Sequence, residues 1–120
     1  MSGGEFIKGT LRTIILKLLA RQKRMYGYEI TQRVALLSHD EIKLTYGALY
    51  PTLYKLEAEG LLVTNTEIVD NRARKYYALT AEGRKLAKAK VSELRRFTEI
   101  LQAILADRPK PNMTAGIWAS

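Results

Sequence analysis

The sequence predicts a mainly α-helical chain with one small β-hairpin, on the basis of three observations. Apolar residues recur at helical spacing over four stretches, of which the last is long. Two runs rich in β-branched and aromatic residues surround a polar turn between the third and fourth stretches. The 120 residues, 47% of them hydrophobic and 27% charged, are typical of one folded domain with or without an oligomerisation element.

The first two helices are predicted over Lys8–Gln22 and Gly27–Leu37 from their apolar stripes. Gly27 lies at the start of the second helix, where it lets the chain turn closely against a neighbour. The second helix ends at Ser38-His39-Asp40. Apolar and polar residues alternate in Glu41–Leu44, so this segment is either a small strand or an extended link.

The third helix is predicted over Tyr46–Glu59, with Thr45 as its N-cap and Gly60 as its stop signal. Pro51 lies early in this helix, where its fixed φ and missing N–H are tolerated. Its buried line consists of Leu49, Leu53 and Leu56. An aromatic ridge with a spacing of four residues consists of Tyr46, Tyr50 and Tyr54.

The hairpin is predicted from two β runs, Leu61–Val69 and Lys75–Leu79, around a turn at Asp70-Asn71-Arg72. We expect the tip of the hairpin to carry three cations, Arg72, Arg74 and Lys75. Thr80 then caps a long helix, which is predicted over Ala81–Ala106.

The long helix carries a short apolar seam with spacings of three, four and three residues: Leu94, Phe97, Leu101 and Ile104. A domain this small cannot cover all four side chains, so the seam predicts a homodimer. We therefore divide the chain into a compact unit over residues 6–79, a dimerisation helix over residues 80–108 and a flexible tail over residues 109–120.

The chain is strongly basic, with 20 Lys and Arg against 12 Asp and Glu, a net charge of +8 and a pI of about 9.8. Such a surplus favours a polyanionic partner, most often nucleic acid. Two helices, a third helix and a hairpin follow one another in the order of a winged helix-turn-helix. In that architecture a helix enters the major groove of double-stranded DNA, and the hairpin, or wing, meets the adjacent backbone. A homodimer would bind a pseudo-palindromic operator, with half-sites spaced by about one helical turn.

The residues expected to contact DNA belong to the third helix and the wing: Thr45, Tyr46, Gly47, Tyr50, Pro51, Thr52, Lys55, Arg72, Arg74 and Lys75. Gly47 is small enough to let the helix backbone approach the DNA closely. Each tyrosine of the ridge has two open roles, packing or DNA contact, because a phenol can bury its ring and still donate to a phosphate.

Three stretches together resemble the PadR family of bacterial transcriptional regulators: FIKGTLRTIILKLLARQKRMYGYEI, YGALYPTLYKLEAEGLL and NRARKYYALTAEG. The resemblance covers Phe6–Gly83 and implies a dimeric winged-helix repressor that a small planar or phenolic effector releases from DNA. The single C-terminal helix is similar to that of the compact subgroup that includes the lactococcal multidrug-responsive regulator. This chain has Leu94 where that regulator has a drug-stacking tryptophan. It also has Asn71 at the wing tip, where many members have glycine, and asparagine tolerates the left-handed conformation.

A shared set of apolar residues is expected at the dimer interface, where an effector would also bind: Ile7, Leu11, Ile15, Leu94, Phe97, Leu101 and Ile104. A plain dimer core without any ligand remains an equally open interpretation of this set.

Two other classes of function were weighed. A winged helix can serve as an interaction module for protein or a membrane surface without sequence-specific DNA binding, and the basic residues of the long helix could meet anionic lipid. An enzyme is disfavoured, because the clustered carboxylates Glu57, Glu59 and Glu82 have no nucleophile or metal ligands beside them. The chain has one histidine, His39, and no cysteine, which fits a cytoplasmic protein. We expect no catalytic residue, no cofactor, no metal and no membrane partner.

Overall fold

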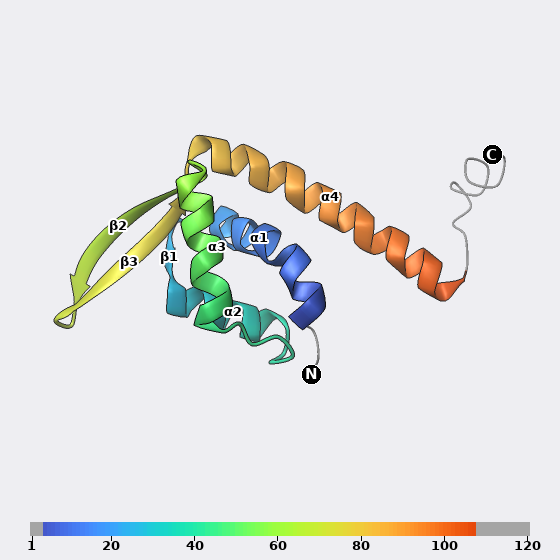
Figure 1. Cartoon of the computed structure of the whole chain (residues 1–120), viewed down its shortest axis with the longest axis horizontal. Helices are drawn as coiled ribbons and strands as arrows, with labels where there is room; N and C mark the ends of the chain where they lie inside the picture. The colour runs from blue at the N-terminus through green and yellow to red at the C-terminus, as the bar shows by residue number, and fades with distance from the viewer. Residues whose placement is uncertain (1–3, 108–120) are drawn as a thin grey trace.

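The computed structural model describes residues 4–107 as four helices and a three-stranded antiparallel sheet (Figure 1). The elements are α1 (Gly4–Arg21), β1 (Met25–Tyr26), α2 (Gly27–Leu37), α3 (Tyr46–Ala58), β2 (Leu62–Val69), β3 (Arg72–Leu79) and α4 (Ala81–Ala106). The predicted tail over residues 109–120 lies outside the described residues, as does the last residue of the predicted dimerisation helix. The predicted fold class, mainly α with a small β-hairpin, is confirmed.

The helix bounds follow the predicted caps closely. The Thr45 hydroxyl accepts a hydrogen bond from the Ala48 amide at 3.2 Å, and the Thr80 hydroxyl accepts one from the Gly83 amide at 3.0 Å. Thr80 also donates to the carbonyl oxygen of Gly60 at 2.8 Å, which ties the start of α4 to the end of α3. The largest difference is at α1, which begins four residues before the predicted start.

The wing, which we define as β2, its turn and β3, forms a regular two-residue hairpin. Val69 pairs with Arg72, so the turn consists of Asp70 and Asn71 alone. Both turn residues have positive φ, 51° and 63°, as a type I′ turn requires. Asn71 thus adopts the left-handed conformation that asparagine tolerates.

One bound of the predicted β structure was wrong, and one short strand was not predicted. β3 begins at Arg72 and not at Lys75, because the tight turn lets pairing start immediately after Asn71. The short strand β1, before α2, was not predicted: it pairs with β3 at the sheet edge, in the order β1-β3-β2. Glu41–Leu44 is an extended link, whose Ile42 and Leu44 pack against the core.

The core lies where α1, α2, α3 and the sheet meet, and the predicted buried line of α3 is fully enclosed. Two residues expected at a dimer interface also lie inside this core: Leu11 is 5% exposed and Ile15 is 0% exposed. The prediction for these two side chains was wrong, because the fold of one chain already covers them. The spacing of apolar residues alone does not show that the stripe of α1 is covered within one chain whereas the seam of α4 is not.

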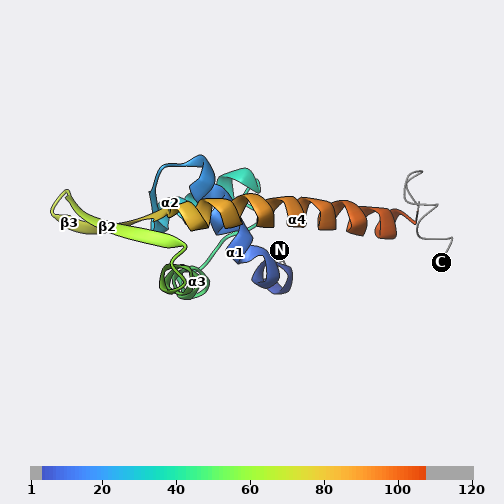
Figure 2. The same cartoon turned by 90° about the horizontal axis from the view of Figure 1, so that it is seen from above.

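Helix α4 packs on α1 along its first part, and the two helices line an open groove as far as Ile100. Gly83 and Ala87 are its only buried residues. Figures 1 and 2 show the last part of α4 extending beyond α1, at the opposite end of the molecule from the wing. Phe97 is 53% exposed and Ile104 is 66% exposed, so the predicted seam is uncovered in one chain. None of the helices over residues 4–107 combines the length and the apolar character that a membrane span requires.

Candidate nucleic-acid interface

The outer surface of α3 is open along most of the predicted contact residues. Thr45, Tyr46, Gly47, Pro51 and Lys55 are exposed, and Thr52 is half-buried with its hydroxyl donating to the Ala48 carbonyl at 3.1 Å. Because Pro51 has no N–H, the Gly47 carbonyl lacks its helical donor, at an exposed place where the helix carries no side chain. A major groove admits an α-helix, so this exposed side of α3 could meet base edges there.

The tyrosine ridge exists, and its three members have different surroundings. The ring centroids lie 5.5 Å apart from Tyr46 to Tyr50 and 5.9 Å apart from Tyr50 to Tyr54. Tyr46 is 50% exposed and Tyr54 is 53% exposed. Tyr50 is half-buried, and its burial, with its neighbours in the ridge, raises its pKa.

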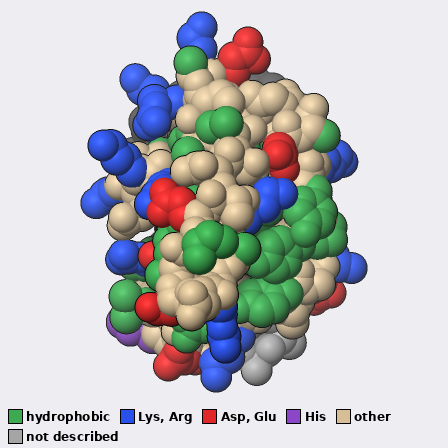
Figure 3. All heavy atoms as spheres, turned by 90° about the vertical axis from the view of Figure 1, so that its left-hand side faces the viewer, with side chains coloured by type: hydrophobic (Ala, Val, Ile, Leu, Met, Phe, Trp, Pro, Cys, Tyr) green, Lys and Arg blue, Asp and Glu red, His purple; other side chains and the backbone are tan. Residues whose placement is uncertain are grey.

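Tyr50 packs against the backbone of Gly27, as the expected close approach requires. A Cβ at position 27 would collide with the Tyr50 hydroxyl and lie 2.8 Å from its Cζ atom. The middle tyrosine therefore packs α3 against the start of α2, whereas the outer two remain accessible. Seen from the wing end, hydrophobic side chains, among which tyrosine is counted, gather on one flank, and Lys and Arg gather along the opposite edge (Figure 3).

The three wing cations do not share the tip, which corrects the prediction. Arg72 alone flanks the turn, where it is exposed. Arg74 and Lys75 are consecutive in β3 and therefore point to opposite faces of the sheet. The Arg74 guanidinium lies 4.5 Å from the centroid of the Tyr26 ring, whereas Lys75 faces α3.

The sheet face away from α3 holds a cluster of interleaved cations and tyrosines that sequence reasoning missed. The Arg24 guanidinium lies 4.0 Å from the centroid of the Tyr76 ring and forms an ion pair with Glu67, one of whose contacts is 3.1 Å long. The hydrogen bond from Arg24 lowers the pKa of Glu67. Tyr26 meets Tyr76 edge to face at 5.4 Å. These contacts join the wing to β1, which helps to fix the wing against the helices.

Tyr77 lies in the core with 1% of its surface exposed. Its buried hydroxyl has no hydrogen-bond partner among the described residues. We expect Tyr77→Phe to stabilise the fold by about 1 kcal/mol at neutral pH, because a buried hydroxyl without a partner costs its desolvation. Urea unfolding of the two proteins measures this difference. A loss of stability in Tyr77→Phe would mean that the hydroxyl has a partner.

Alkaline pH should widen the difference between these two proteins. Burial raises the pKa of Tyr77 from 10.0 to about 12, so the folded state keeps its proton in this range and the unfolded state loses it. The stability of the wild type is therefore expected to fall more than that of Tyr77→Phe between pH 10 and about 12. The same urea titrations at pH 9 and above, where this step begins, measure the effect.

An open groove runs between α1 and the projecting part of α4. Its lining includes Gly9, Thr13, Leu94, Phe97 and Ile100. Ile7 is half-buried near the start of α1 and Leu101 is 39% exposed on α4. Five members of the predicted interface set are thus at least partly accessible: Ile7, Leu94, Phe97, Leu101 and Ile104.

Comparisons with known proteins agree with this architecture. Residues 15–89 match the transcriptional regulator PadR-like family. The chain is 40% identical over 97 residues to the Transcriptional regulator Rv3488 of Mycobacterium tuberculosis. The aligned stretch covers 81% of this chain and 83% of that protein.

Two solved structures extend the match to the fold. A transcriptional regulator from Clostridium thermocellum superposes with a TM-score of 0.73 at 28% identity, over 82% of this chain and 95% of its own. A PadR family transcriptional regulator from Eggerthella lenta superposes with a TM-score of 0.71 at 27% identity, over 84% and 86% of the two chains. With its helices, its wing and its matched sequence taken together, the chain belongs to the PadR family of transcriptional regulators.

Proposed function

We propose that this chain is a homodimeric repressor that binds an inverted repeat in double-stranded DNA and is released by a small planar apolar ligand. The exposed outer surface of α3 carries the proposal, because it lies beside a wing with an exposed cation at its tip. The net charge of +8 supports a polyanionic partner.

The proposed division of labour follows from exposure. The exposed residues of α3, from Thr45 to Lys55, meet base edges and the phosphates that flank them, and Arg72 meets the backbone beyond the groove. Arg74 is half-buried over Tyr26 and acts at the edge of this surface. Tyr50 supports α3 from behind, while Tyr46 and Tyr54 are available to donate to phosphates.

Dimerisation and effector binding are proposed for the uncovered seam of α4. A second copy placed on Phe97, Leu101 and Ile104 would remove apolar surface from water. The two-fold axis would then present two recognition helices to one side of a duplex, with half-sites spaced by about one helical turn. The groove that contains Leu94 and Phe97 would lie near this interface and is the proposed site for the ligand.

Removal of two exposed cations tests the DNA surface. We expect Lys55→Gln with Arg72→Gln to lower the affinity for duplex DNA by about tenfold or more at 0.1 M salt. The slope of log K against log salt should become less steep by about two, because two phosphate contacts are lost. Fluorescence anisotropy over a salt series measures both quantities. The same titration in the presence of planar aromatic dyes tests the release by a ligand.

The matched control removes two exposed cations of α4 outside the groove, Lys85→Gln with Lys88→Gln, and leaves α3 and the wing unchanged. A protein that binds DNA through α3 and the wing loses much less affinity in this control. Equal losses in the two double variants would show that affinity follows net charge alone and would contradict the proposed surface.

A further inference from the structure

Lys75, which the sequence assigned to the DNA surface, already has a partner within the chain. Its Nζ atom lies 3.7 Å from Oε1 of Glu57, on α3. The same ammonium lies 5.4 Å from the ring centroid of Tyr54 and 5.5 Å from that of Tyr77. A carboxylate and two aromatic rings therefore hold the cation in the space between the wing and the recognition helix.

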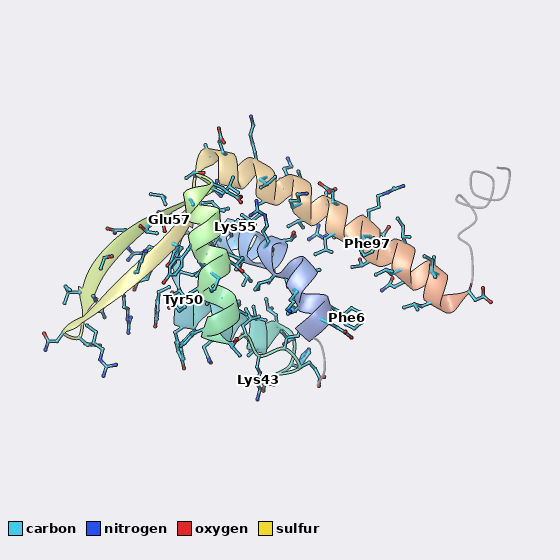
Figure 4. The ribbon with its side chains drawn as sticks, viewed as in Figure 1. Phe6, Lys43, Tyr50, Lys55, Glu57 and Phe97 are labelled. Carbon is cyan, nitrogen blue, oxygen red and sulfur yellow. The ribbon has the colours of Figure 1, made fainter. Side chains whose placement is uncertain are left out.

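Glu57 uses its second oxygen as well. The Thr64 hydroxyl, on β2, donates to Oε2 of Glu57 at 3.3 Å. One side chain of α3 is thus joined to both strands of the wing, to Thr64 on β2 and to Lys75 on β3. Figure 4 shows Glu57 on the part of α3 that lies next to the wing, one turn or less from Lys55 and farther along the helix than Tyr50.

The ion pair with Glu57 orients Lys75, and it is exposed enough for another anion to compete for the ammonium. The side chain of Lys75 is 44% exposed and that of Glu57 is 36% exposed, so water screens the pair. A DNA phosphate that approached this space would compete with the carboxylate for the ammonium. It would also be repelled by the carboxylate itself, because like charges brought together are unfavourable.

We propose that Glu57 is a specificity-determining residue, which holds Lys75 in the space between α3 and the wing and so withholds a cation from the phosphate backbone. This inference rests on the proposed DNA-binding function. Complexes with unrelated sequences depend almost entirely on cation–phosphate contacts, so they lose most when one cation is withheld. Complexes with the operator also use base edges, which require α3 and the wing at a fixed angle, and the contacts of Glu57 supply that constraint.

The variant that tests the proposal is Glu57→Gln, which keeps the shape of the side chain and its acceptor for Thr64. We expect its affinity for a mixed-sequence duplex of about two helical turns to rise about fivefold at 0.1 M salt. The slope of log K against log salt should steepen by about one, the value for one added phosphate contact. The affinity for an operator, selected by the wild type from a randomised duplex pool, should rise by less than about twofold. The ratio of operator to mixed-sequence affinity therefore falls.

The matched control is Glu59→Gln. Glu59 lies on the same helix end and pairs with Arg12 of α1, and the two side chains are 37% and 38% exposed. This variant removes one negative charge close to position 57 without freeing a wing cation. We expect it to change the mixed-sequence affinity by less than about twofold and to leave the salt slope unchanged.

A double-mutant cycle with Lys75→Gln identifies the cation. In the wild-type background, this change should lower the mixed-sequence affinity by less than about twofold, because Lys75 is already held. In the Glu57→Gln background it should lower the affinity about fivefold and remove the added slope. A purely structural role of the pair would predict altered thermal unfolding in all three variants and no steeper salt slope in any of them.

The outcomes are separable. Equal effects of Glu57→Gln and Glu59→Gln, or the same cost of Lys75→Gln in both backgrounds, would overturn the inference. If the wild type bound no duplex even at low salt, the proposed function itself would fail, independently of these variants.

Discussion

Replacement of Gly83 by alanine is expected to destabilise the protein by about 3 kcal/mol or more, although alanine is the better helix former. Gly83 is the third residue of α4 and is buried against the chain that leaves α3. A Cβ at this position would collide with the carbonyl oxygen of Leu61, and it would lie 3.0 Å from the Leu61 carbonyl carbon and 3.2 Å from Cδ2 of Leu79.

The obstacle at Gly83 cannot move aside at low cost, because it is backbone. The Leu61 carbonyl accepts a hydrogen bond from the Thr80 amide at 3.0 Å, and the Leu61 amide donates to the Leu56 carbonyl at 3.0 Å. A shift of Leu61 would strain both bonds and displace an 8% exposed leucine from the core. The whole junction between α3, the wing and α4 therefore resists an added methyl group.

The control for this prediction is Gly47→Ala, near the start of α3. A Cβ there would meet only the Thr45 hydroxyl oxygen, at 3.9 Å, so alanine should raise the stability by about 0.5–1 kcal/mol. Urea unfolding of the two variants and the wild type measures both changes. Equal stability of Gly83→Ala and Gly47→Ala would show that the α4 junction is looser than the structure indicates.

Long periodic segments explain how much of the fold could be predicted from the sequence. The apolar stripes of α2 and α4 extend over several turns, and their predicted bounds equal the observed ones. β1 has two residues, too few to show any period, and exists only because β3 offers it an edge. The position of β1 therefore depends on a pairing with residues about fifty positions away, which local pattern does not contain.

The sequence could predict which elements form the candidate site, but not which side chains contact one another within it. The third helix and the wing were identified from caps, turn chemistry and charge, and these are local signals. The roles of Arg74 and Lys75 depend on hairpin register, since one residue of displacement exchanges the two faces of a strand. If a two-residue turn at Asp70-Asn71 is assumed, β3 begins at Arg72, and Arg74 and Lys75 then point to opposite faces of the sheet. The pairing of Lys75 with Glu57 requires the angle between α3 and the wing, which the sequence does not state.

If the chain forms the proposed dimer, Phe97→Asp together with Ile104→Asp is expected to convert it to a monomer and to weaken binding to an inverted repeat by about 10²–10⁴-fold. Phe97 lines the groove between α1 and α4 and is 53% exposed, and Ile104, farther along α4, is 66% exposed. In the proposed dimer the new carboxylates would lie within the interface, and burial of unpaired charges is strongly unfavourable.

The large loss of DNA affinity follows from linkage between the two half-sites. Once one subunit of a dimer is bound, the second meets its half-site at a high effective concentration, and a monomer loses this gain entirely. Sedimentation velocity measures the oligomeric state, and anisotropy with duplexes of one and two half-sites measures the affinities. Affinity for a single half-site should change far less than affinity for the inverted repeat.

A charge-matched control distinguishes loss of the dimer from simple repulsion between the new carboxylates and DNA. Ser92→Asp with Thr98→Asp adds the same two charges at exposed positions of α4 that do not belong to the seam. If repulsion were the cause, the two double variants would lose the same affinity as each other, both for the duplex with one half-site and for the duplex with two. If the seam holds the dimer, the control keeps its two-site affinity, because the proposed role of α4 is to fix the distance between two copies of α3.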